Sequence, residues 1–488
     1  MISGAPVWGR LIFLVNWQNM KIKQKYQYIF AAAAFVAAYI FFQFFYPYHL
    51  MRREQQTLFL FDLPYIFRTY SGPGCISRFL GDFLEQFFCF KVAGPLVVAA
   101  LLTAIGTLSY KICRNFSGRK VSLLISTIIY IWCFLRETET IYITRYTIAV
   151  AGYLLCIWAA LKFRKPVLKF GSLAVFLALA LLLFGNPYHK NYGKLIGKPD
   201  LEFEKLISLD VETSRENWDK VLEVSKKNLL YNEACYFYNL ALAKKGLLSE
   251  TLLQHPQNYA NGLFLLVTDQ ISPFSNGLAG EVWYQLGNMT LADQSAMVAM
   301  QSSPKHTGAR YIRRMAMLNL ISEEYGSAEK YLKMLDKTLV YHKWAESMIP
   351  ENQSEETKAD LDARRRNLVR TDVVSESNNY RLLLHKLLEA NPGNTMAKEY
   401  LLCYDLLNCN LAAFMEDYVP EKNNPKVYQE AALIWINIQH SEGNISNDVD
   451  MDKFGITMDA IERLKKFYQF PNRYKSTYWS YYTNAMGE

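Results

Sequence analysis

Hydrophobic residues are concentrated in the first part of the chain, in five stretches separated by short polar segments. Each stretch approaches the roughly 20 apolar residues that a helix needs to cross a bilayer. Beyond residue 190 the pattern changes to amphipathic helices without strand alternation. The pattern predicts an all-α protein, a polytopic membrane helix bundle followed by an irregular helical-repeat domain. The predicted transmembrane helices are 29–46, 92–112, 120–136, 143–162 and 167–185.

The same pattern predicts the domain boundaries. Met20 comes directly before KIKQKYQ and the first apolar stretch, where such a membrane anchor normally starts. We therefore expect residues 1–19 to be an upstream extension, with Met1 as the alternative start. No A-x-A cleavage site follows the stretch, which favours a retained anchor over a cleaved signal peptide. The predicted parts are a cytoplasmic N-terminus (1–25), a transmembrane domain (26–189), a helical-repeat block (190–349), a charged linker (350–377) and a second helical-repeat block (378–488).

Basic residues predict the orientation of the bundle. They gather before the first stretch, between the second and third, and around the junction of the fourth and fifth, without acidic residues among them. Such short basic segments are typical of the cytoplasmic side. Five crossings then place the C-terminal domain outside the cytoplasm of a bacterial plasma (inner) membrane. The basic residues are Arg10, Lys21, Lys23, Lys25, Lys111, Arg114, Arg119, Lys120, Lys162, Arg164, Lys165 and Lys169.

One helix leaves the number of crossings open. Its apolar core, Val121 to Leu135, is short, so Lys120 and Arg136 have to extend toward the interfaces. The net charge of +8 is concentrated beside the apolar stretches, and we do not expect nucleic acid as a partner.

The first predicted outer loop, 47–91, carries an amphipathic pattern. Ser71 to Gly74 is a turn signal that sets the start of a helix. In that helix we expect Asp82 and Glu85, with Arg78, to form the face toward water. The apolar positions of the opposite face are Ile76, Phe79, Leu80, Phe83, Leu84, Phe87 and Phe88.

Carboxylates in this loop are the candidate catalytic groups. Membrane glycosyltransferases that use lipid-linked sugar donors place a catalytic carboxylate in a first outer loop, where it accepts a proton from an incoming hydroxyl. Glu54 or Asp62 is the candidate base for that reaction. In the alternative interpretation, Glu54 pairs with Arg52 or Arg53. The second outer loop, 136–139, is charged, and ion pairing or solvation explains it.

The C-terminal region shows paired helices joined by small turns. Residues 231–245 end at Gly246, Asn391-Pro392 opens a later pair, and Pro425 opens the last one. These pairs are similar to tetratricopeptide repeats and predict a concave surface suited to peptides, proteins or glycans. An orthogonal helical bundle without a groove is the alternative. Residues 350–377 predict an exposed helix or loop, with a division near 360.

Motifs for metals and cofactors are missing from the sequence. The eight cysteines show no C-x-x-C spacing, and the seven histidines show no H-x-x-x-H or H-E-x-x-H, so surface or capping roles suffice for them. A Gly-rich phosphate loop is also absent. We expect no metal and no cofactor, and the sequence favours a protein that is not an enzyme.

Several short segments carry a resemblance to a known family. They are Glu54-Gln55 with Phe59 or Phe61, Pro73-Gly74 before Phe83-Leu84 and Gln86-Phe87-Phe88, Asn239 to Leu242 with Gly246, and Ala328 to Leu332 with Trp344-Ala345. The chain resembles a bacterial family of multi-pass membrane proteins, a domain of unknown function with a tetratricopeptide-like extracytoplasmic region. Cys75 stands where a second glycine is usual, and this chain has fewer membrane helices than longer members. The resemblance implies architecture and no particular activity.

The sequence therefore predicts an integral membrane protein whose extracytoplasmic helical domain is a binding or assembly surface. We expect its partners to be the lipid bilayer and envelope proteins or polysaccharide machinery. A reduced glycosyltransferase that uses a lipid-linked sugar donor is the alternative.

Overall fold

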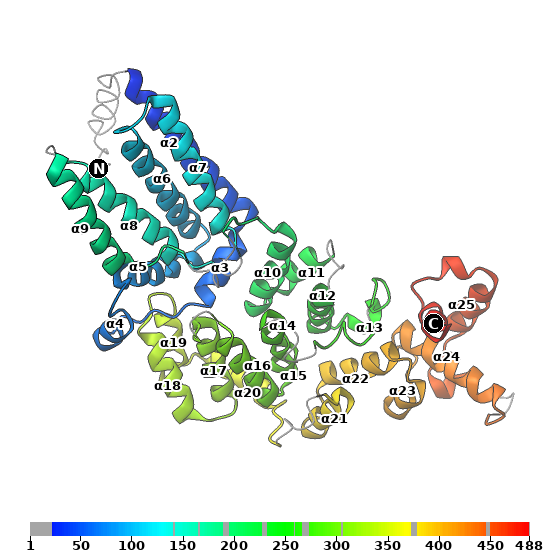
Figure 1. Ribbon diagram of the computed structural model, residues 1–488. Coiled ribbons are helices and arrows are strands. Elements are labelled where there is room, and N and C mark those ends of the chain that lie inside the picture. The colour runs from blue at the N-terminus through cyan, green and yellow to red at the C-terminus, as the bar shows by residue number, and fades with distance from the viewer. Residues whose placement is uncertain are drawn as a thin grey trace, which may run out of the picture. The chain divides into compact units, whose positions relative to one another are not determined.

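The computed structural model describes the chain in ten segments, 22–139, 142–163, 166–188, 195–226, 232–257, 259–265, 273–303, 306–371, 378–445 and 449–487. These residues form helices joined by turns and loops, with no β-strand among them (Figure 1), which confirms the all-α prediction. They fall into two units, residues 1–204 with 337–340 and residues 205–336 with 341–488. The predicted extension, 1–19, lies outside the described residues.

Five long helices form the body of the first unit and run side by side (Figure 1). Each coincides closely with one predicted apolar stretch. The first continues into a π-helical turn, η1 (Phe41–Phe45), before Pro47 starts the next helix. The five helices are α2 (Ile22–Ile40), α6 (Ala93–Cys113), α7 (Arg119–Glu137), α8 (Arg145–Ala160) and α9 (Pro166–Phe184).

The surface of this bundle is apolar. On α7, Ser122 and Ser126 are buried, whereas Leu124 and Ile128 are 62% and 58% exposed. Polar groups therefore face the neighbouring helices and aliphatic groups face outward, the reverse of a water-soluble bundle. Charged residues lie at both ends of α7, with Arg119 and Lys120 at its start and Arg136 and Glu137 at its end.

Two of the described helices, Gln27–Phe45 and Ala93–Cys113, are long and apolar enough to cross a membrane by length and composition. Helices Arg145–Ala160 and Phe170–Phe184 are apolar but shorter. A bundle with five crossings stays a prediction.

Short helices cover one end of the bundle (Figure 1). Among them, α5 corrects the prediction for the 47–91 loop. Two of the three residues expected to face water are buried, since Asp82 and Glu85 are each 2% exposed, whereas Leu80 on the expected apolar face is 36% exposed. Gly81 permits this burial, because the missing side chain lets α5 lie directly against the backbone of Arg145 on α8. The helices at this end are α3 (Pro47–Gln55), α4 (Leu63–Thr69), α5 (Cys75–Glu85) and the 3₁₀ turn η2 (Gln86–Cys89).

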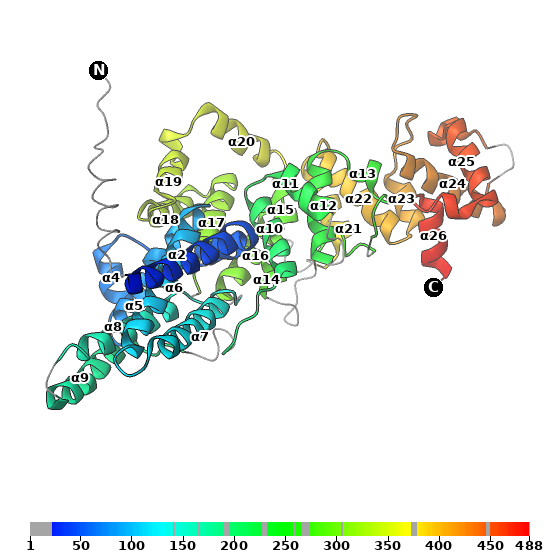
Figure 2. The same cartoon turned by 90° about the horizontal axis from the view of Figure 1, so that it is seen from above.

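The second unit is a succession of short helices in which neighbours along the chain pack on each other (Figure 2). Small residues permit close contact. A Cβ atom built on Gly280 would lie 2.6 Å from that of Ser295, so only glycine fits between these two helices. The first helices are α10 (Leu201–Ser214), whose first turn belongs to the first unit, α11 (Trp218–Ser225), α12 (Asn232–Lys244), α13 (Leu248–Thr251), α14 (Pro273–Leu278), α15 (Gly280–Leu286) and α16 (Met289–Gln301).

The remaining helices continue this arrangement. They are α17 (Ala309–Ile321), α18 (Tyr325–Asp336), α19 (His342–Met348), α20 (Glu355–Arg365), α21 (Tyr380–Ala390), α22 (Thr395–Leu407), α23 (Leu411–Asp417), α24 (Lys426–Ser441), α25 (Met458–Gln469) and α26 (Tyr478–Gly487), with 3₁₀ turns at Pro350–Asn352, Met451–Phe454 and Pro471–Arg473.

Asparagine side chains start several of these helices. Asn288, Asn394 and Asn410 each accept a hydrogen bond from the backbone N–H three residues later. Such caps satisfy a donor that the first helical turn leaves unpaired, and each stabilises a helix by about 1 kcal/mol. Gly246, with φ of 67°, follows the end of α12, and Pro425 precedes α24, both as predicted.

The charged segment after residue 350 contains the helix α20, which is largely exposed. An exposed helix was one of the two structures predicted for this segment. Residues 372–377 lie outside the described part. Apart from residues 195–204 and 337–340, the described parts of the two predicted repeat blocks belong to one unit. The division near 360 stays a prediction.

Candidate functional site

The candidate base Asp62 has two local partners. Its carboxylate caps α4 by accepting a hydrogen bond from Tyr65 N at 3.2 Å, and it pairs with Lys337 Nζ at 2.8 Å, in the segment grouped with this unit. The hydrogen bond from Lys337 lowers the pKa of Asp62. A carboxylate with a lowered pKa is a weaker base, so it accepts a proton less readily. Asp62 therefore has a structural role, and its role as a base stays a prediction.

Glu54 lies in a different setting. It is buried on α3, with a side chain only 4% exposed. The neighbouring Arg53 forms its ion pair with Glu137, at 2.5 Å between Nη1 and Oε2. Glu54 is thus buried, whereas Asp62 is partly exposed. A catalytic role for Glu54 also stays a prediction.

A buried polar cluster surrounds Glu137 at the end of α7; we define it as His49, Arg53, Glu137, Tyr142 and Thr147. Arg53 Nη2 donates to the Glu137 carbonyl oxygen at 2.6 Å, and the other Glu137 carboxylate oxygen accepts from the Thr147 hydroxyl. The Tyr142 hydroxyl lies 3.0 Å from Thr147 Oγ1, and His49 Nε2 lies 3.2 Å from the Glu137 carbonyl oxygen. Burial lowers the pKa of His49 well below its usual range, so its imidazole is neutral.

The buried acids of α5 join this end of the bundle together. Glu85 accepts hydrogen bonds from Thr57 Oγ1 at 2.8 Å and from Thr144 N at 3.0 Å. Asp82 accepts one from the Tyr70 hydroxyl at 2.9 Å. The contact with Thr144 connects the 47–91 loop to the connection between α7 and α8, and the other two hold the loop together internally. The sequence left ion pairing and solvation as explanations for the charged 136–139 loop. Glu137 forms an ion pair with Arg53 and is fully buried, so solvation does not explain this residue.

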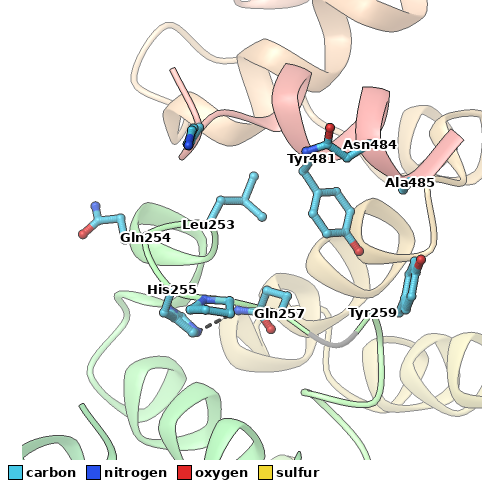
Figure 3. Close-up of a pocket in the computed structure, with 10 residues that line it drawn as sticks. Leu253, Gln254, His255, Gln257, Tyr259, Tyr481, Asn484 and Ala485 are labelled. Carbon is cyan, nitrogen blue, oxygen red and sulfur yellow. Dashed lines mark hydrogen bonds between the residues drawn. The ribbon is translucent and has the colours of Figure 1, made fainter. Parts of the chain in front are cut away.

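A cavity of about 510 Å³ lies in the second unit (Figure 3). His255 and Gln257, in the segment after α13, face Tyr481 and Asn484 of α26 across it. The lining combines amide groups and aromatic rings with a single charged side chain, that of Lys475. The complete lining is Leu253, Gln254, His255, Pro256, Gln257, Tyr259, Lys475, Tyr481, Asn484 and Ala485.

Hydrogen bonds from behind hold the cavity wall in place. Asn239 on α12 accepts at Oδ1 from the ring of His255, at 2.9 Å, and donates from Nδ2 to Gln257 Oε1 at 3.1 Å. On the facing side, the Tyr481 hydroxyl donates to the Leu407 carbonyl oxygen at 2.7 Å. Burial lowers the pKa of His255 to about 4. The wall at neutral pH is therefore preformed and uncharged at this histidine.

A second cavity, of about 460 Å³, lies where α12 and α13 meet α22 and α24. At its wall, Glu399 accepts hydrogen bonds from Ser249 N at 2.8 Å and Ser249 Oγ at 2.7 Å. Tyr418 and Tyr428 also line it. The second unit thus contains two hollows lined by polar and aromatic side chains.

Sequence reasoning missed the residues of both cavities. The segments 253–259 and 475–485 are far apart in the chain and contain no motif. The expected surface or capping role is wrong for His49, which is 2% exposed. His255 is half-buried, with its ring hydrogen-bonded to Asn239. Only the Asn239 to Leu242 segment, singled out for its resemblance, pointed near the first cavity.

Comparison with known proteins assigns the class of the chain. Residues 22–190 and 187–485 match a family of unknown function, DUF6057, and the protein belongs to that family. No curated protein and no solved structure matches the chain.

Proposed function

We propose that this protein is an integral membrane protein whose second unit is an extracytoplasmic binding surface for an envelope protein or for polysaccharide machinery. The cavity between His255 and Tyr481 carries the binding part of the proposal. It is large enough for part of a polypeptide or a few sugar rings, it is preformed, and its amide and aromatic lining suits a polar ligand of low charge. The paired helices that surround it resemble those of repeat proteins, which bind partners on concave surfaces.

Outward-facing apolar side chains support the membrane part. Within the two candidate spans, 17% and 28% of the apolar window is buried inside the protein. A core helix of a water-soluble protein is mostly buried, and monomeric soluble proteins rarely expose large continuous apolar patches. Lipid tails are the solvent that suits such a surface.

The arrangement of charges supports the orientation. Lys111 and Arg114 lie at the end of α6, Arg119 and Lys120 lie at the start of α7, and Lys162 follows α8. These residues, Lys120 apart, line one cavity, so the α6–α7 connection and the end of α8 lie at the same end of the bundle. The positive-inside rule then favours that end as the cytoplasmic one.

Topology is tested first, with alkaline phosphatase and fluorescent-protein fusions after residue 200 and at the C-terminus. We expect phosphatase activity and dark fluorescence at both positions. Active fluorescence without phosphatase activity at both would place the second unit in the cytoplasm and overturn the extracytoplasmic proposal.

Binding is tested in cells with a photocrosslinking amino acid in place of Tyr259, which lines the cavity and is 45% exposed. Tyr468 on α25 is the matched control, because it is a tyrosine of the same unit, 70% exposed, outside the cavity lining. We expect a discrete crosslinked envelope component from position 259 alone. The same products from both positions, or none from either, would contradict a binding role for this cavity.

A further inference from the structure

The first unit also contains a cavity of about 530 Å³ lined by basic side chains, which we call the basic cavity. Four helices and their connections form it, namely α2, the end of α6, the start of α7, and α8. Four of its residues are cationic and none is acidic. The lining residues are Gln27, Tyr110, Lys111, Arg114, Asn115, Arg119, Trp158, Leu161 and Lys162.

The cations of this cavity have no carboxylate close by in the sequence. No Asp or Glu occurs in residues 86–136 or 140–199, which include α6, α8 and α9 and most of α7. Among the described residues, Lys111, Arg114 and Lys162 form no ion pair; Arg114 donates instead to the Ser117 carbonyl oxygen at 3.0 Å. Like charges that converge without a counterion repel each other, and a bound anion removes that repulsion.

Trp158 organises the two lysines. The ammonium group of Lys162 lies 4.6 Å from the centre of the indole ring, and that of Lys111 lies 5.7 Å from it. Cation–π contacts of this kind hold ammonium groups in place without neutralising them. Both remain able to donate hydrogen bonds to an anion, and the N-terminus of α7, which starts at Arg119, adds a partial positive charge.

We propose that the basic cavity binds a phosphate-bearing group, the headgroup of an anionic phospholipid. Lys and Arg together are the side chains that recognise phosphate oxygens, and basic pockets between membrane helices on the cytoplasmic side suit such headgroups. Apolar side chains for the acyl chains are near, since Val121 on α7 and Leu155 on α8 are 50% and 48% exposed. The inference rests on the proposed membrane insertion. Free polyphosphates carry the same anionic phosphate oxygens as a phospholipid headgroup, so the test includes one of them.

The test uses the purified full chain in detergent, mixed with phosphatidylglycerol, phosphatidylcholine or soluble pyrophosphate, with native mass spectrometry and thermal unfolding as readouts. We expect phosphatidylglycerol to be retained and to raise the Tm, and phosphatidylcholine to do neither. Lys111→Gln with Lys162→Gln should weaken phosphatidylglycerol retention about thirtyfold, from about 1 kcal/mol per lost cation. Lys465→Gln with Lys466→Gln, an exposed pair on α25, removes the same charge and should change nothing.

The outcomes separate the two proposals. Stabilisation by pyrophosphate that is lost in the Lys111 and Lys162 variant would keep the phosphate site but assign it to a soluble ligand. Equal retention of phosphatidylglycerol by the variant and the wild type, at an unchanged Tm without lipid, would overturn the inference and leave membrane insertion intact. A chain that stays monomeric in buffer without detergent would instead overturn the proposed function.

Discussion

Arg53 and Glu137 form a buried ion pair between α3 and the end of α7, with side chains 5% and 0% exposed. The pair is reinforced because Arg53 also donates to the Glu137 carbonyl oxygen at 2.6 Å. Since 84 positions separate the two residues, the contact joins the 47–91 loop to the bundle. A buried charge depends on its partner, and this dependence leads to the first prediction.

Glu137→Leu should destabilise the first unit, because it leaves the Arg53 guanidinium buried without its carboxylate. We expect the free energy of unfolding to fall by roughly 3–5 kcal/mol, whereas Arg53→Met with Glu137→Leu should recover most of the loss. Thermal unfolding of the single and double variants in detergent measures both effects. Glu329→Gln, which breaks an exposed pair with Lys333, is the control and should change little. A double variant no more stable than the single one would contradict this prediction.

Gly81→Ala should loosen the contact between α5 and α8. A Cβ atom at this position would lie 3.0 Å from Arg145 Cα and N, so backbone has to move. We expect a loss of about 1–3 kcal/mol in the free energy of unfolding. Gly171→Ala on α9 is the matched control, because nothing lies within 4 Å of the added atom. If the two variants unfold at the same temperature, the close approach of Gly81 to Arg145 does not require a glycine, and the prediction is wrong.

Asp62 offers a test of the catalytic alternative. Asp62→Ala removes the cap of α4 and should cost about 1 kcal/mol, whereas Asp62→Asn keeps an oxygen that accepts from Tyr65 N. We expect Asp62→Asn to complement a deletion strain as well as the wild type does. Loss of complementation with unchanged expression and Tm would instead support the proton-accepting role.

The stability of the second unit should depend on pH through His255. Burial lowers the pKa of this imidazole from 6.5 to about 4. Above pH 6.5 both folded and unfolded states are neutral; below it the unfolded state takes up a proton that the folded state resists. Stability is therefore lost as pH falls through this window. Thermal unfolding at neutral pH and at about pH 5 should show a smaller decrease in Tm for His255→Gln than for the wild type. An equal decrease would mean that other groups control the effect.

Local pattern was sufficient for the long helices of the first unit. The apolar stretches coincide with α2, α6, α7, α8 and α9, and the 3.6-residue spacing of Phe79, Phe83 and Phe87 marked α5 and the turn after it. Helix periodicity and caps depend on residues within a few positions of each other, so a single sequence contains that information.

The environment of each face was decided by tertiary structure. The pattern in α5 identified a polar and an apolar face but wrongly expected water at the polar one. Glu85 is buried because it accepts hydrogen bonds from Thr57 and Thr144, which lie elsewhere in the chain. Periodicity separates two faces of a helix, and only the neighbours decide which one is buried.

The cavities and the charged clusters also depended on the fold. His255 meets Tyr481, and Arg53 meets Glu137, across separations that leave no local signal. The composition and order of the helices are thus properties of the sequence read in short windows. Which side chains converge, and which charges stay without a counterion, follows from packing between distant segments, because burial and Coulomb interactions act through space and not along the chain.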